Sequence, residues 1–434
     1  MFSKRNFFIE GNRNFCEKLE EKNSMQLGHV LRYSIISLVV LLILTIPIIP
    51  KWGSLVLVTL GIVGIGNVIY KREPIQVPLF FYFLIGAYAV RVLWLLRATD
   101  IEYGLKCLET ESALLAVPVI FSMFKLTDRE KKLAIDAFVL MSFLIIAYSL
   151  FHLYAFIYTS SYSLTDYLVA HLNNRKQFSE TNMLNWRFAL PSFLSVIIIY
   201  GFTLFFLDKR TTGRRTILLV IFACAAIIFI ILSGSRFGLF MFVLAGFFCL
   251  IIRLNSSLKR SLLIVNIFIF VSAILVLVFI PQSRSRAFYE RLDPLRVVQI
   301  ERAVIEWKKN PWLGFGTGST KEVIRNVEWE KIDQIFNHPH NQYLTELIQF
   351  GIIGSIPLMM FLITAFAFGI KTGNRELISI LVLFSIFMLV ESPINSNKGL
   401  VPFLVVVSLL VNNVDDRFKI SLLHKSSSKS KIKN

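Results

Sequence analysis

Apolar residues occur along this chain in long runs, and short polar segments separate one run from the next. A run of about 20 apolar residues is long enough to cross a hydrocarbon core of about 30 Å as a helix. We therefore predict an all-α polytopic membrane protein of about twelve transmembrane helices. The predicted spans are 30–49, 52–70, 77–96, 107–124, 133–157, 188–207, 217–232, 237–252, 262–280, 343–370, 377–391 and 400–412.

These spans define the organisation of the chain. Residues 1–29 form an N-terminal tail, residues 30–280 contain helices 1 to 9, and residues 343–412 contain helices 10 to 12. The large loop 281–342 separates the two sets of helices, and the basic tail 413–434 follows them.

The large loop is predicted to be partly helical. Asp293-Pro294 is a good helix start, because a carboxylate can cap free N–H groups and proline suits the first helical position. Asn310-Pro311 is a stop signal, so a helix is expected over 294–309.

The distribution of Lys and Arg predicts the orientation of the helices. These residues are more frequent in the connections that alternate with loop 281–342 than in those on the same side as it. Cytoplasmic loops carry such an excess. Both termini are therefore predicted to be cytoplasmic and the large loop to lie outside, together with segment 158–187.

Composition and net charge narrow the class of protein. Of 434 residues, 55% are apolar and 17% are charged, too few charges to cover soluble domains of this size. A net charge of +18 would suggest nucleic acid in a soluble protein, but no nucleic-acid-binding motif is present. We expect membrane lipids, and not nucleic acid, beside these charges.

The segment His338-Pro339-His340-Asn341 precedes the tenth apolar run. Pro339 keeps His338 extended, which places His340 at the mouth of the following helix. A helix N-terminus favours neutral imidazole, so His340 is a candidate general base. The alternatives are a structural histidine and a metal ligand, for which this segment holds too few donors. We predict no metal and no cofactor.

Arginines near the predicted outer surface are candidate anion-binding groups. Ser235-Arg236 interrupts an apolar stretch and is predicted to form the tip of a tight outer hairpin. The guanidinium of Arg236 can either anchor at the lipid boundary or bind a diphosphate through two parallel hydrogen bonds. Arg296 and Arg302 lie on the predicted loop helix, about 120° apart around its axis, and should not share one face.

Two further groups of residues each allow two interpretations. The glycines from Gly314 to Gly318 predict either a simple turn or a backbone nest for a lipid-linked phosphate. Glu346 and Gln349 in the tenth span, and Glu391 at the outer end of the eleventh, are either functional groups or helix–helix hydrogen-bond partners.

Three of these features resemble the O-antigen ligase and polymerase superfamily of bacterial envelope glycan assembly. His340-Asn341, then nine residues, then Gly351-Ile352-Ile353-Gly354 is similar to the ligase signature. Ser235-Arg236 with Gly238 resembles the family's Ser/Thr-Arg turn. Arg296, fifteen residues before Pro311, resembles its loop arginine.

The resemblance implies a metal-independent glycosyltransferase of the bacterial inner membrane. It would join an undecaprenyl-diphosphate-linked O-antigen glycan to a sugar of the lipid A core at the periplasmic face. His340 would be the general base, and Arg236 and Arg296, with Arg302 as an alternative in register, would hold the diphosphate. The supporting residues would be Ser235, His338, Asn341, Gly351, Gly354 and Glu391.

Two alternatives remain open. A polymerase of the same superfamily would use the same donor but a lipid-linked glycan as acceptor. A transporter would carry polar residues near mid-span in matched halves. Here the polar candidate residues lie mostly at the outer ends of the spans, which favours chemistry at the membrane surface over transport.

Overall fold

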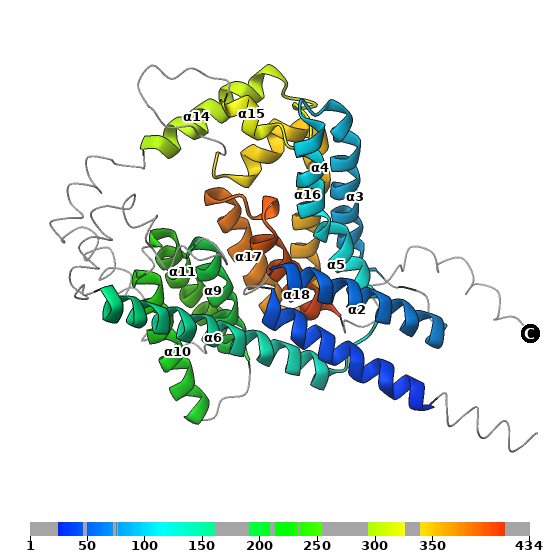
Figure 1. The fold of residues 1–434 in the computed structure, drawn as a ribbon, viewed down its shortest axis with the longest axis vertical. Coiled ribbons are helices and arrows are strands. Elements are labelled where there is room, and N and C mark those ends of the chain that lie inside the picture. The colour runs from blue at the N-terminus through cyan, green and yellow to red at the C-terminus, as the bar shows by residue number, and fades with distance from the viewer. Residues whose placement is uncertain are drawn as a thin grey trace, which may run out of the picture.

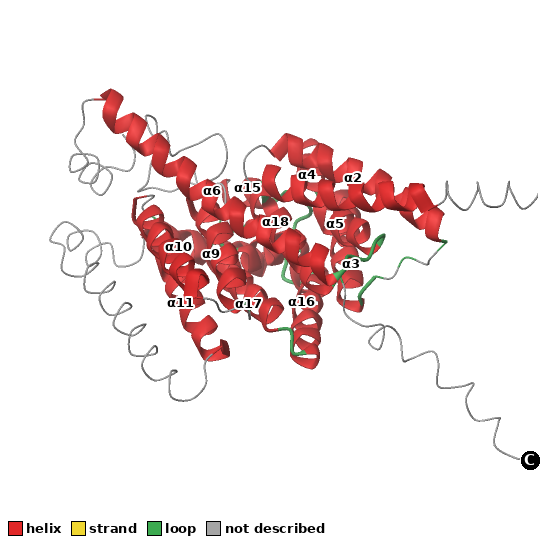
Figure 2. Ribbon diagram, turned by 90° about the horizontal axis from the view of Figure 1, so that it is seen from below, coloured by secondary structure: helices red, strands yellow, loops and turns green. Residues whose placement is uncertain are grey.

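The computed structural model describes residues 25–46, 50–72, 75, 77–160, 191–208, 213–232, 235–253, 294–325 and 339–412. Within these ranges the regular elements are helices, as predicted (Figures 1 and 2). After a first helix at Met25–Thr45 they are α2 (Pro50–Lys71), α3 (Leu79–Trp94), η1 (Leu95–Arg97), α4 (Ile101–Glu111), α5 (Ala113–Ser122), α6 (Asp128–Ser160), α9 (Pro191–Leu207), α10 (Gly213–Leu232), α11 (Arg236–Arg253), α14 (Pro294–Lys309), α15 (Thr320–Arg325), α16 (Gln342–Thr372), α17 (Arg375–Val390), η2 (Pro393–Asn395) and α18 (Asn397–Val411).

Several described helices are long and apolar enough to cross a membrane. The six that meet both criteria are Met25–Thr45, Trp52–Lys71, Leu79–Arg97, Asp128–Phe151, Gly213–Ile231 and Gln342–Thr372. Shorter apolar helices are Phe193–Leu207, Phe237–Ile252 and Asn397–Val411. The polytopic all-α fold is confirmed, while the predicted span 262–280 lies outside the described residues.

One predicted span differs from the structure. The stretch 107–124 is interrupted at Ser112, and its first residues belong to α4, which already begins at Ile101. The apolar α5 that follows has 10 residues and rises about 15 Å at 1.5 Å per residue, half of a hydrocarbon core. The acidic residues of α4 therefore lie at the end of the bundle and not within a single continuous span.

Helix α18 forms the centre of the bundle. Its residues from Gly399 to Val411 are all buried, and it contacts α5, α6, α9 and α17. The ring of Phe403 stacks on Phe384 of α17, with centroids 3.5 Å apart and an interplanar angle of 5°. Figure 2 shows α18 between the group α6, α9, α10 and α11 on one side and the group α2, α3, α4 and α5 on the other.

The ends of the helices that were predicted to be cytoplasmic meet one another. The Asn412 side chain donates to the carbonyl of Phe121 at 2.9 Å, and Lys131 Nζ donates to Leu410 O at 2.9 Å. Arg375 Nη1 donates to Ile252 O at 3.0 Å, which joins α17 to the end of α11.

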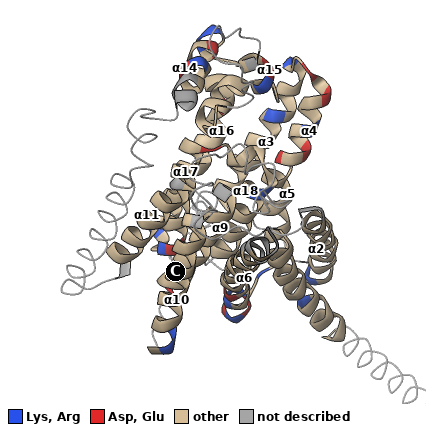
Figure 3. Ribbon diagram, turned by 60° about the vertical axis from the view of Figure 1, so that its left-hand side comes forward, with Lys and Arg blue, Asp and Glu red and all other residues tan. Residues whose placement is uncertain are grey.

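At the other end of α16 lie α4, α14, α15 and the segment before α18 (Figure 1). Figure 3 shows charged residues gathered towards the two ends of the bundle, with mostly uncharged helices between them. His340 and Asn341 before α16, and Glu391 after α17, lie together at this end of the bundle.

Candidate functional site

His340 lies immediately before α16 and contacts a carboxylate from a neighbouring helix. Its Nδ1 is 3.1 Å from Oε2 of Glu391, the residue at which α17 ends. The His340 side chain is 40% exposed, whereas that of Glu391 is 11% exposed. If Nδ1 carries the proton and donates it to Glu391, Nε2 keeps its lone pair as a hydrogen-bond acceptor.

The backbone around His340 is fixed by the cap of α16. His340 has φ 48°, a left-handed conformation that is uncommon for residues other than glycine. Asn341 is the N-cap: its Oδ1 accepts from the N–H of Leu344 at 3.0 Å, and its Nδ2 donates to Leu389 O at 3.0 Å. Asn341 therefore ties the start of α16 to the end of α17, and this geometry holds the strained residue before it.

Side chains of α16 also hold the segment Glu391–Ser396, which connects α17 to α18. Gln342 Oε1 accepts from the N–H of Ile394 at 3.1 Å, and Gln342 Nε2 lies 3.3 Å from Oδ1 of Asn395. Thr345 and Ser392 share a hydroxyl–hydroxyl contact of 3.2 Å. The position of Glu391 is thus set from both ends, by α17 and by the hydrogen bonds of α16.

A buried ionic cluster lies next to this segment. Arg91 of α3 is completely buried and pairs with two carboxylates, Glu111 of α4 at 2.6 Å and Glu346 of α16. Its guanidinium carbon lies 4.8 Å from the centroid of the Phe350 ring. Glu346 also accepts from Gln342 Nε2 at 2.9 Å, so the cluster is joined to the hydrogen bonds that hold Glu391–Ser396.

No role was predicted for Arg91 or Glu111 from the sequence. Arg91 could have been singled out as a charged residue inside the apolar run 77–96. An arginine within a span needs a buried partner, which makes such a residue a candidate for an ion pair. Its two partners come from distant parts of the chain, and no pattern within the chain identifies them.

The glycine-rich segment forms a turn against a break in α16. At Gly351 the helix has φ 62°, and a Cβ there would overlap the carbonyl of Trp312. The N–H groups of Phe315 and Gly316 donate to the carbonyls of Ile348 and Gln349 at 2.9 and 2.8 Å. The carbonyls of Pro311 and Trp312 accept from Ile352 and Ile353 at 2.9 and 3.1 Å, so the break leaves its polar groups paired.

This pairing decides between the two interpretations of the glycines. Gly314, Phe315, Gly316, Thr317, Gly318 and Ser319 all donate their backbone N–H to protein acceptors. They cannot also point together at a phosphate. The turn is confirmed and the phosphate nest is not formed.

The glycines of the ligase-like signature serve packing. Gly351 lets the turn meet α16, and a Cβ at Gly354 would lie 3.2 Å from Cγ1 of Val90 on α3. Gln349 is likewise structural, since its Oε1 accepts from Gly318 and its Nε2 donates to Thr320 Oγ1 at 2.8 Å.

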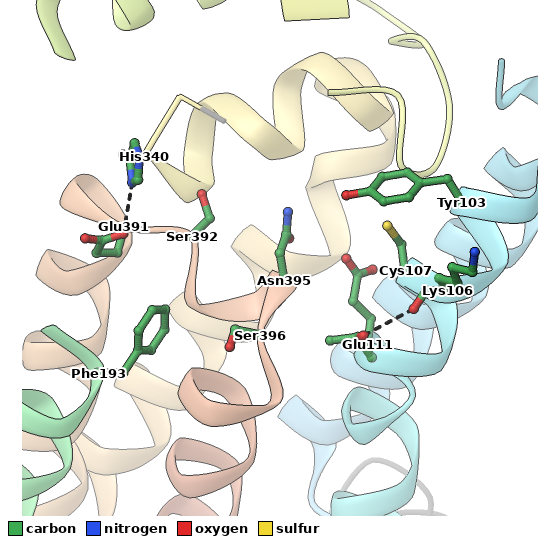
Figure 4. A pocket seen from close by; sticks show the side chains of 11 residues that line it. Tyr103, Lys106, Cys107, Glu111, Phe193, His340, Glu391, Ser392, Asn395 and Ser396 are labelled. Atoms are coloured by element: carbon green, nitrogen blue, oxygen red, sulfur yellow. Dashed lines mark hydrogen bonds and ion pairs between the residues drawn. The ribbon is translucent and has the colours of Figure 1, made fainter. Parts of the chain in front are cut away.

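An open cavity of about 320 Å³ lies between His340 and α4 (Figure 4). Its lining residues are Tyr103, Lys106, Cys107, Thr110, Glu111, Phe193, His340, Glu391, Ser392, Asn395 and Ser396. Burial raises the pKa of the Cys107 thiol to about 12, so this cysteine remains a protonated thiol and is no nucleophile. The cavity therefore offers an imidazole, carboxyl groups, one lysine and uncharged hydrogen-bonding groups.

The structure describes the backbone of all three predicted arginines, but the side chain of Arg302 alone among them. Arg236 is the first residue of α11 and follows Ser235, whose Oγ accepts from the N–H of Gly238 at 3.1 Å and so caps the helix. Arg296 lies in the first turn of α14, whose bounds equal the predicted 294–309. The side chains of Arg236 and Arg296 lie outside the description, as does the whole of His338.

Arg302 has a partner of its own. Its Nη2 lies 2.7 Å from Oε1 of Glu306, one turn further along α14. Its Nε is buried without a hydrogen-bond partner in the described part of the chain, and Arg302 does not line the cavity. In the ranges that the structure describes, no group of three or more His, Cys, Asp or Glu side chains is arranged to hold a metal ion.

Part of the chain matches a known protein family. Residues 219–359 match the family model described as O-Antigen ligase, from within α10 to within α16. The matched stretch contains Ser235, Arg236, α14 and the signature from His340 to Gly354. No curated protein matches the chain. The resemblance to the O-antigen ligase and polymerase superfamily is confirmed over this stretch.

Proposed function

We propose that this chain, with its O-antigen-ligase-type segment at 219–359, is a metal-independent glycosyltransferase of the bacterial inner membrane. It transfers a glycan from undecaprenyl diphosphate to a sugar hydroxyl of the lipid A core at the periplasmic face. The observation that carries this proposal is the pair His340–Glu391, 3.1 Å apart, at the wall of an open cavity.

In the proposed reaction His340 acts as the general base. Its Nδ1–H donates to Glu391, and Nε2 accepts the proton of the acceptor hydroxyl as that oxygen attacks the anomeric carbon of the donor sugar. The bond from this carbon to the diphosphate oxygen breaks, and the diphosphate leaves with the electron pair. Glu391 stabilises the imidazolium that forms, as a carboxylate does beside a catalytic histidine in other enzymes.

Arginines stabilise the leaving diphosphate in this proposal. Arg236 and Arg296 are the first candidates, because a planar guanidinium binds phosphate oxygens in pairs. Arg302 ranks behind them, since it would have to exchange its contact with Glu306. Such cations stabilise the charge that develops on the departing oxygen.

The test is to measure how much glycan is attached to the lipopolysaccharide of a deletion strain. We expect loss of this chain to leave long lipid-linked polymer that is not attached to the lipid A core, and the wild-type chain to restore attachment. His340→Ala, at equal abundance in the membrane, should restore none. Single repeat units on the core would instead indicate the polymerase, and unchanged lipopolysaccharide would refute both functions.

A further inference from the structure

The cavity beside His340 has a second wall that the proposed chemistry does not use. Helix α4 contributes Tyr103, Lys106 and Glu111, and the segment before α18 contributes Asn395 and Ser396. In Figure 4 the hydroxyl end of Tyr103 and the side chain of Asn395 lie between α4 and the His340–Glu391 pair. A volume of about 320 Å³ is at the lower end of the range of pockets for small ligands, roughly 300–1,000 Å³.

Polar groups of this wall are available to a ligand. Asn395 accepts from Gln342 through Oδ1, and within the described residues its Nδ2 has no protein acceptor. Asn395, Ser396 and Tyr103 line the cavity and are half-buried. The Tyr103 hydroxyl is hydrogen-bonded to the Cys107 thiol, and its oxygen can take a further partner. Amide and hydroxyl groups in such a position fix the orientation of a ligand that carries several hydroxyl groups.

The charges of the cavity disfavour a phosphate at this wall. Glu111 and Glu391 both line it. The one lysine that lines it, Lys106, is paired with Glu102 at 2.7 Å. Carboxylates close to a phosphate would repel it, and Arg91 already shares its guanidinium between Glu111 and Glu346. The diphosphate of the donor must therefore approach His340 from another direction.

Resting on the proposed function, we infer that Tyr103, Asn395 and Ser396 bind the acceptor sugar, an uncharged pyranose whose free hydroxyl points at His340. The ring occupies the cavity between α4 and the segment Glu391–Ser396. Two sources can present this chemistry, the sugar of a lipid A core and the terminal sugar of a lipid-linked glycan.

The test uses purified full-length protein in detergent, with an undecaprenyl-diphosphate-linked glycan as donor. Acceptors are core lipopolysaccharide, a lipid-linked repeat unit, and two short glycosides that differ by one phosphate on the acceptor sugar. Tyr103→Phe and Asn395→Ala should each raise the KM for the acceptor by about 2- to 10-fold, the effect of one lost neutral hydrogen bond, with the donor KM unchanged. Tyr88→Phe on α3, outside the cavity, is the matched control and should change neither constant.

A binding measurement separates this inference from the proposed function. His340→Ala should lose transfer yet still bind the neutral glycoside, weakened by no more than about 2- to 10-fold, the effect of one lost hydrogen bond, as measured by the ligand-induced shift in thermal unfolding. If the wild type binds the glycoside but transfers nothing, and Asn395→Ala weakens that binding, the proposed function alone would be overturned. Transfer with unchanged acceptor KM in Tyr103→Phe and Asn395→Ala, or preference for the phosphorylated glycoside, would overturn the sugar site alone.

Discussion

At the scale of single residues, the orientation of His340 depends on a carboxylate that comes from another helix. Glu391 ends α17, and its backbone N–H donates to Phe387 O at 2.9 Å, so the carboxylate is anchored to a regular helix. Glutamine at this position keeps an oxygen that can accept from Nδ1 but removes the negative charge. The two contributions of Glu391, orientation and charge, can therefore be measured separately.

We predict that Glu391→Gln lowers kcat while Glu391→Ala lowers it further, and that His340→Ala removes the full general-base contribution of about 10²- to 10⁴-fold. The measurement is the initial rate of glycan transfer at saturating donor and acceptor. Equal rates for the wild type and Glu391→Ala would show that the contact between Glu391 and His340 plays no part in the reaction.

A second residue-scale prediction concerns Arg236, the first residue of α11. Arg236→Lys keeps the charge but loses the planar pair of donors, so transfer should fall if the guanidinium binds the diphosphate. Arg214→Lys, at the opposite end of the hairpin in α10, is the matched control. If both lysine variants transfer at the wild-type rate, Arg236 is an anchor at the lipid boundary and does not bind substrate.

At the scale of elements, the break in α16 explains why glycine is required at position 351. Gly351 has φ 62° and a Cβ there would overlap the backbone of the glycine-rich turn. Gly373, which ends the same helix, has φ 63° but open space around its Cβ position. Both glycines have a positive φ, but Gly373 has a left-handed helical ψ of 23°, whereas Gly351 has a ψ of -170°, a combination essentially confined to glycine.

We therefore predict that Gly351→Ala destabilises the protein more than Gly373→Ala. The left-handed helical conformation of Gly373 costs about 1–2 kcal/mol for a residue with a side chain. The backbone of Gly351 lies in a region that such residues avoid more strongly, and Gly351→Ala must also displace the turn. The measurement is the midpoint of thermal unfolding in detergent for both variants. Equal midpoints would mean that the turn does not press on α16 as described.

The Arg91 cluster is the second feature at this scale, because it joins α3, α4 and α16. Arg91→Met would leave two buried carboxylates without their cation, and we predict a loss of about 3–5 kcal/mol of stability. Adding Glu111→Gln and Glu346→Gln to Arg91→Met should recover a large part of this loss. If the triple variant is no more stable than Arg91→Met, the loss arises from packing and not from charge.

Helix boundaries could be predicted from the sequence, whereas contacts between distant segments could not. Helix α14 has the predicted bounds because Asp293-Pro294 and Asn310-Pro311 are local signals within the chain. The cap of α16 was likewise local, and Asn341 occupies it. The Arg91 cluster, the partner of His340 and the role of Gly351 required contacts between segments far apart, and no periodic pattern contains that information.

At the scale of the whole molecule, the ends of the helices form two separate groups on opposite ends of α16. Lys125 belongs to the predicted cytoplasmic group and Glu102 to the predicted periplasmic group, and both are exposed. In a background without Cys16, Cys107, Cys224 and Cys249, we predict that Glu102→Cys reacts with a membrane-impermeant thiol reagent in cells whose outer membrane has been permeabilised. Lys125→Cys should react only after the inner membrane is opened, and the reverse pattern would place His340 in the cytoplasm.

Because the backbone of residues 311–316 is hydrogen-bonded to the interrupted middle of α16, this part of the large loop belongs to the framework that carries His340. Ala303 and Ile324 pack with Ile348 of α16 and fasten α14 and α15 to the same framework. Insertions between Lys309 and Thr320 should consequently abolish activity, because they would displace a turn on which the middle of α16 depends.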